Sequence, residues 1–231
     1  MDVLSAIAIV PSAPVLVAEL AGAAATEVAD LSAAVLAAAA LLPPRWIALG
    51  IGPADRVLGP DSAGTFAGFG VDVRVRLSAP ARTEPPAELP LCALITGWVR
   101  GQARPDAAAE VRVYRGDHDA DTALAHGRRL RAEIDGTPDP VGVLVVADGS
   151  NTLTPRAPGG YDPGNAAAQL ALDDALADGD IAALTRLPEP ILGRVAFQVL
   201  AGLAEPGPRS AKELYRGAPY GVGYFAGAWQ P

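Results

Sequence analysis

The run Val141–Ala147 (VGVLVVA), followed directly by Asp148–Leu153 (DGSNTL), decides the fold class of this chain. A short valine-rich run that ends at a polar loop is typical of a strand buried on both faces of a sheet. Such a strand needs helices above and below it, because both of its faces must be covered. The sequence therefore predicts an α/β fold in which this strand lies near the sheet centre.

Strand and helix patterns alternate outward from that run. Further strands are predicted at Leu4–Val10, Arg45–Ile51, Val71–Leu77 and Val111–Tyr114. Helices are predicted at Glu19–Leu42, Pro90–Gln102, Ala120–Ile134, Asn165–Ala177 and Ile191–Leu203. The first of these helices is rich in alanine, which has the highest helix propensity, and a Pro-Pro pair ends it. The Gly- and aromatic-rich tail, Tyr215–Trp229, carries no helix or strand prediction.

Composition excludes several classes of protein. A formal charge of −8 argues against binding nucleic acid through its phosphates. No apolar run reaches the roughly 18 to 20 uninterrupted residues that a membrane-spanning helix requires. The first apolar run follows an acidic residue at position 2 and no basic segment, so it does not resemble a signal peptide. A cytoplasmic protein without membrane or nucleic-acid partners is expected.

Cys92 is the only cysteine of the chain. A single cysteine rules out an intramolecular disulfide and a cysteine-cluster metal site. It lies in the apolar stretch Leu89–Ile95, where a buried, inert thiol is expected rather than a nucleophile.

Three loops are the candidates for function, because ligands of an open α/β sheet bind at the carboxyl ends of its strands. These loops are Pro11–Pro14, Gly52–Asp55 and Asp148–Arg156. A G-x-S-x-G nucleophile elbow centred on Ser150 is absent, because Asp148 and Thr152 stand where glycines are needed.

Two of these loops lie in stretches that resemble a known enzyme family. Ile9–Val17 (IVPSAPVLV) is similar to an opening motif, Pro-His-x-Pro followed by an apolar run. Ala123–Arg131 and the later Val141–Leu153 are together similar to a helix followed by a strand and a Ser-His loop. Both patterns belong to the LigB-type catalytic subunit of class III extradiol ring-cleavage dioxygenases. The resemblance implies a single α/β domain over residues 1–231, with a mixed central sheet flanked by helices.

The resemblance also implies an Fe(II) site, held in that family by two histidines and a glutamate, with a further histidine as acid–base group. At the positions of the two histidine ligands this chain has Ser12, which offers a hydroxyl, and Gly52, which has no side chain. At the position of the acid–base histidine it has Asn151, whose amide does not titrate near neutral pH. The segment of the glutamate contains Arg194 and Gln198, with Glu189 close by. No metal, no cofactor and no catalytic residue are therefore predicted.

The two histidines of the chain, His118 and His126, do not suit a shared metal on helical spacing. Eight steps of about 100° leave them about 80° apart and two turns distant. A solvated surface position is expected for His118 and a helix-surface or interface position for His126. Asp55, Asp61 and Asp148 suggest a hard-cation site, but loop-capping aspartates are the simpler interpretation.

The sequence thus predicts a non-catalytic relative of the extradiol dioxygenases that binds a small phenolic or anionic molecule or a partner, with a homo-oligomer possible. Its vestigial pocket is assigned to Ser12, Gly52, Asp148, Ser150, Asn151 and Arg194, joined by Tyr161. Two alternatives stay open: an active ring-cleavage dioxygenase or other oxidoreductase with unrecognised metal ligands, and a small-molecule hydrolase using Asp148 or Ser150.

Overall fold

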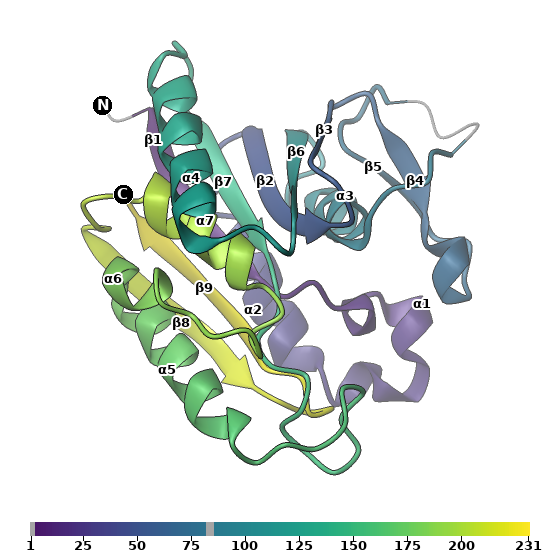
Figure 1. Cartoon of the computed structure of the whole chain (residues 1–231). Helices are drawn as coiled ribbons and strands as arrows, with labels where there is room; N and C mark the ends of the chain where they lie inside the picture. Colours follow the sequence, from purple (N-terminus) through teal and green to yellow (C-terminus); the bar gives the residue numbers. More distant parts are fainter. Residues whose placement is uncertain (1–2, 82–85) are drawn as a thin grey trace.

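A mixed seven-stranded sheet forms the centre of the molecule (Figure 1). The computed structural model describes residues 3–81 and 86–231. The strands of this sheet are β1 (Leu4–Val10), β2 (Arg45–Gly52), β3 (Arg56–Leu58), β6 (Ala108–Arg115), β7 (Val141–Val146), β8 (Ser210–Gly217) and β9 (Tyr224–Gln230). They lie in the order β3-β6-β2-β7-β1-β9-β8. β4 (Ala63–Thr65) and β5 (Arg74–Arg76) form a separate two-stranded sheet.

The four strands β6, β2, β7 and β1 run parallel to one another. Val10 pairs with Val146, and Gly52 pairs with Arg115, so these strands end side by side. Their carboxyl ends therefore place the loops that follow them along one edge of the sheet. The flanking strands β3, β9 and β8 pair antiparallel with their neighbours, which makes the sheet mixed, as predicted.

Helices cover both faces of this sheet (Figure 1). They are α1 (Ala18–Ala21), α2 (Ala29–Ala39), α3 (Leu91–Ala103), α4 (Ala120–Asp135), α5 (Asn165–Asp178), α6 (Ile181–Leu184) and α7 (Arg194–Leu203), with short 3-10 turns at Pro14–Leu16, Gly22–Thr26 and Phe66–Phe69. α2 and α3 pack on one face, and α4, α5 and α7 pack on the other. The predicted α/β architecture is confirmed.

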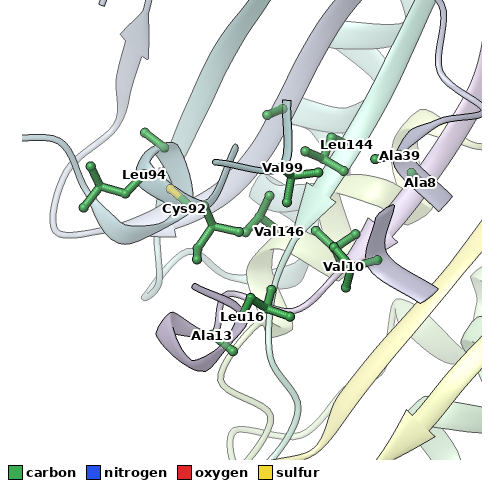
Figure 2. Close-up of a cluster of buried hydrophobic side chains, with 14 of the residues drawn as sticks. Ala8, Val10, Ala13, Leu16, Ala39, Cys92, Leu94, Val99, Leu144 and Val146 are labelled. Atoms are coloured by element: carbon green, nitrogen blue, oxygen red, sulfur yellow. The ribbon is translucent and has the colours of Figure 1, made fainter. Parts of the chain in front are cut away.

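Alternation along the central strands divides the interior into two cores. In β1, Ala8 and Val10 face the core under α2 and α3, whereas Ile7 and Ile9 face the core under α4, α5 and α7. Figure 2 shows the first of these cores, where Cys92 of α3 lies near Val146 of β7. Cys92 is buried, as predicted, and burial raises the pKa of its thiol to about 12.

α4 and α7 cross in close backbone contact. A Cβ atom on Gly127 of α4 would lie 2.1 Å from the carbonyl oxygen of Val199, and one on Gly202 of α7 would lie 2.2 Å from that of Leu124. Only glycine permits this approach, so the crossing fixes the position of α4 relative to the sheet.

Two sequence predictions are wrong, and one segment without a prediction forms strands. The helix predicted at Glu19–Leu42 is broken into α1, a 3-10 turn and α2, because Gly22 adopts a positive φ of 54° after α1. The strand predicted at Val71–Leu77 is limited to β5 and pairs with β4 instead of joining the main sheet. The Gly- and aromatic-rich tail, Tyr215–Trp229, in contrast, contains the end of β8 and most of β9.

In the part of the chain that the structure describes, no helix is both long and apolar enough to cross a lipid bilayer.

Candidate functional site

Asp148 occupies the carboxyl end of β7, beside the loop that follows β1. The backbone N–H of Ser12 donates a hydrogen bond of 2.8 Å to Oδ1 of Asp148, and the backbone N–H of Gly193 donates one of 2.8 Å to its carbonyl oxygen. Burial raises the pKa of the Asp148 carboxyl to about 7, while the bond from Ser12 acts in the opposite direction. Burial at this edge therefore favours the protonated form of the Asp148 carboxyl.

A buried glutamine holds the loop after Asp148 in place. Oε1 of Gln169 accepts a hydrogen bond of 2.8 Å from the backbone N–H of Ser150, and its Nε2 donates one of 2.8 Å to Oδ1 of Asp173. A Cβ atom on Gly149 or Gly223 would lie 2.0 or 2.1 Å from Oε1 of this glutamine, so the side chain passes between two glycines. Burial raises the pKa of Asp173 to about 6. Gln169 was not among the predicted site residues, because a helix pattern does not show which of its polar side chains contacts a loop distant in sequence.

The side chains of Ser150 and Asn151 belong to the loop structure itself. Oγ of Ser150 lies 2.9 Å from Oγ1 of Thr152, which also accepts a hydrogen bond of 2.8 Å from Nδ2 of Asn165. Asn151 packs against Gly159, where a Cβ atom would lie 2.3 Å from its Oδ1. Ser150 is buried and has a hydroxyl partner instead of a base, which does not support the hydrolase alternative.

Within the described residues, no hydrogen bond joins the remaining predicted pocket residues, Arg194, Gly52 and Tyr161, to Asp148. Nη1 of Arg194 donates hydrogen bonds of 3.3 Å to the carbonyl oxygen of His118 and to Oε1 of Gln198, so its guanidinium faces the loop between β6 and α4. Gly52 packs against Val113 of β6, with a Cβ distance of 2.6 Å. Tyr161 is 55% exposed. Of the predicted group, the structure joins Ser12 directly to Asp148 and places Ser150 and Asn151 in the loop that follows.

The positions carried over from the extradiol family do not fit the iron of that family. Ser12 offers a hydroxyl, and its backbone N–H is bonded to Asp148. Gly52 has no side chain, and Asn151 offers an amide packed against the backbone. Fe(II) in this type of site requires imidazole nitrogens, and both imidazoles of the chain lie elsewhere.

His118 and His126 lie together with Asp55 at the ends of β2 and β6. Nε2 of His118 is 2.9 and 3.0 Å from Oδ1 and Oδ2 of Asp55. The two imidazole rings have centroids 5.2 Å apart, and one ligand atom from each of the three residues lies within 4.8 Å of the others. The prediction that the histidines lie two helical turns apart is wrong, because α4 begins only at Ala120, after His118.

The prediction of a solvated His118 is also wrong, since 17% of its side chain is exposed. Burial acts to raise the pKa of Asp55, but hydrogen bonds from the backbone N–H of Arg115 (2.7 Å) and from His118 outweigh it and lower that pKa. Burial lowers the pKa of His126, and a charge on His118 lowers it further. The ring of His126 also packs on that of Tyr114, with centroids 5.0 Å apart.

Asp55 and Asp148 take part in separate networks, one with His118 and one with Ser12. The hard-cation hypothesis that grouped these two aspartates with Asp61 gains no support from these contacts.

Comparison with known proteins supplies a fold and no family. No family model matches the sequence, and no curated protein matches it. A solved structure of an uncharacterized protein from Escherichia coli K12 is similar, with a TM-score of 0.56 over 97% of this chain and 99% of that one. The two sequences are 8% identical, so the likeness concerns the fold alone.

Proposed function

We propose that this protein is a non-catalytic relative of the class III extradiol dioxygenases that binds a small phenolic molecule at the edge formed by Ser12 and Asp148. The proposal is supported by the resemblance of the loops after β1 and β7 to that family. It is also supported by the hydroxyl, glycine and amide found where the family has imidazoles.

The observation that carries the proposal is the carboxyl group of Asp148. Burial raises its pKa to about 7, and it holds a hydrogen bond from Ser12. A desolvated carboxylate accepts a hydrogen bond from a phenolic hydroxyl favourably, because the donor replaces lost water. An anionic ligand would meet a like charge there, and the guanidinium of Arg194 faces His118 instead. Of the two predicted ligand classes, the phenolic one therefore fits better.

The test is calorimetric titration of the protein with catechol and with benzoate, its anionic counterpart. We expect catechol to bind and benzoate to bind at least tenfold more weakly. Asp148→Ala should weaken catechol binding at least tenfold, whereas Asp61→Ala, a substitution of another loop aspartate, should leave it unchanged. Equal catechol binding by both variants, or no binding by the wild type, would refute the proposal.

A second candidate function is ring cleavage or another oxidation with metal ligands outside the family positions. The cluster of Asp55, His118 and His126 favours it, because two histidines and one carboxylate are the ligand set of many non-haem iron oxygenases. Oxygen uptake on catechol by protein loaded anaerobically with Fe(II) distinguishes the two. Uptake that disappears in His126→Gln would establish the second candidate and overturn the first.

A further inference from the structure

The loops after β2 and β6 bring three potential metal ligands to one place. Asp55 follows β2, His118 follows β6, and His126 lies in the second turn of α4. The three ligand atoms lie within 4.8 Å of one another. These residues are not the positions matched to the family's metal ligands and acid–base histidine, which in this chain are Ser12, Gly52 and Asn151.

We propose that Asp55, His118 and His126 form a binding site for a divalent transition metal such as Zn²⁺. Two imidazole nitrogens and one carboxylate oxygen are the donors that Zn²⁺ takes in three-ligand sites. Donor atoms about 2.0–2.2 Å from a tetrahedral zinc ion lie about 3.3 Å from one another. The distance of 3.0 Å between Nε2 of His118 and Oδ2 of Asp55 is already close to that spacing. His126 reaches it by a shift of at most about 1.5 Å, within reach of side-chain rotation.

A cavity next to the cluster leaves room for the remaining coordination position. This cavity has a volume of about 270 Å³, and Asp55 and His126 are among the residues that line it. Tyr114, Arg129 and Glu133 form part of its wall. Three protein ligands with an open fourth position are the arrangement of metal sites that bind water or a small molecule, as opposed to closed structural sites.

Neighbouring groups hold the ligands in place. The backbone N–H of Arg115 donates a hydrogen bond of 2.7 Å to Oδ1 of Asp55, which leaves Oδ2 for the metal. The guanidinium of Arg194 donates hydrogen bonds to the carbonyl oxygen of His118 and to Oε1 of Gln198. Nε2 of Gln198 in turn donates a hydrogen bond to the carbonyl oxygen of Thr185. Such outer contacts orient ligands and preserve metal affinity.

The rival interpretation is an Asp55–His118 hydrogen bond that ties two loops together without any metal. The two interpretations differ in what His126 does, because the hydrogen bond does not need it and the metal site does. They also differ in how the protein responds to added Zn²⁺.

The test is titration of tag-free, full-length protein with Zn²⁺ by calorimetry, with Asp55→Asn and His126→Gln as site variants. Asp121→Asn is the matched control, because its exposed carboxylate lies between the two histidines in sequence and outside the cluster. We expect one equivalent of Zn²⁺ to bind wild type and control alike, and each site variant to bind at least tenfold more weakly. Thermal unfolding of every variant establishes that it is folded.

Imidazole proton–nitrogen NMR spectra provide a second measurement, because the chain has two histidines. We expect Zn²⁺ to shift the ring signals of both. Shifts confined to His118, binding that survives His126→Gln, or no binding by the wild type would overturn the proposal. Catechol binding at Asp148 is measured without metal, so failure of the phenolic-ligand proposal and failure of the metal site are separate results.

Discussion

The ends of β1 and β7 differ from the ends of β2 and β6, although all four strands are parallel and finish at the same edge of the sheet. The first pair carries a desolvated carboxyl, Asp148, whose Oδ1 accepts a hydrogen bond from the backbone N–H of Ser12. The second pair carries both histidines and a carboxylate with a lowered pKa. The fold determines where functional loops lie, but individual side chains decide which strand ends hold metal-binding chemistry.

The largest expected effect concerns Asp148 and depends on pH. Burial raises its pKa from 3.8 to about 7, so the unfolded chain loses this proton first as the pH rises. The stability that protonated Asp148 contributes is therefore complete below about pH 4 and is lost as the pH rises to about 7. Asp148→Asn keeps a neutral side chain, and we expect it to gain stability relative to wild type by up to about 4 kcal/mol between pH 4 and 8.

Urea unfolding across that pH range measures this gain. The exposed Asp139→Asn variant is the control and should show a nearly constant difference from wild type. A constant difference for Asp148→Asn as well would show that this carboxyl is not desolvated, and the contrast between the two pairs of strand ends would lose its main basis.

The next largest effect is on the free energy of unfolding and concerns the crossing of α7 with α4, the helix that carries His126. Gly127→Ala places a Cβ atom 2.1 Å from a backbone oxygen, and we expect a loss of about 3 kcal/mol in the free energy of unfolding. Gly101→Ala in α3 is the matched control, because a Cβ atom there meets nothing within 4 Å. It should instead gain up to about 1 kcal/mol from helix propensity. Denaturant unfolding that shows equal effects would contradict the close crossing.

A smaller effect is expected from the glutamine that supports the Asp148 side. Gln169→Leu leaves the backbone N–H of Ser150 without its acceptor, at a cost of about 2 kcal/mol in unfolding free energy. The exposed Gln102→Leu variant should change stability by less than about 0.5 kcal/mol. Zn²⁺ affinity should be unaffected in both variants, and a loss of it in Gln169→Leu would show that the two networks are coupled.

The smallest effect sharpens the proposed metal site. Arg194→Ala removes the hydrogen bond to the carbonyl oxygen of His118, and we expect Zn²⁺ affinity to fall about tenfold, or about 1.4 kcal/mol. Arg131→Ala, which breaks an ion pair with Asp135 elsewhere on α4, is the control and should bind Zn²⁺ as wild type does. Calorimetry compares the two, and equal affinity would remove Arg194 from the support of the site.

Much of the fold was predictable from local patterns. The valine density of β7 and the apolar run of β1 identified the two strands at the sheet centre, and β1 spans the predicted residues Leu4–Val10. Strands β8 and β9 were not predicted, because they depend on long-range pairing, of β9 with β1 and of β8 with β9, which leaves no local signal in the sequence. The break after α1 was missed because the high helix propensity of the many alanines in this segment outweighed the low helix propensity of Gly22 in the prediction.

The candidate site was less predictable, for reasons of chain geometry. The separation of His118 and His126 was predicted with helix geometry, which does not apply to a residue before the helix N-cap. Asp119 caps α4 by accepting a hydrogen bond from the N–H of Thr122, which agrees with the predicted helix start at Ala120 and leaves His118 before the helix. The approach of Asp55 depends on β2 lying next to β6, and no local pattern reveals strand order.

We propose that metal binds at the ends of β2 and β6 and not at those of β1 and β7. Anomalous diffraction at the zinc edge from crystals soaked in Zn²⁺ shows where the metal lies. We expect a peak within coordination distance of Asp55, His118 and His126 and none beside Ser12 and Asp148. A peak beside Ser12 and Asp148, or no peak at the histidines, would contradict it.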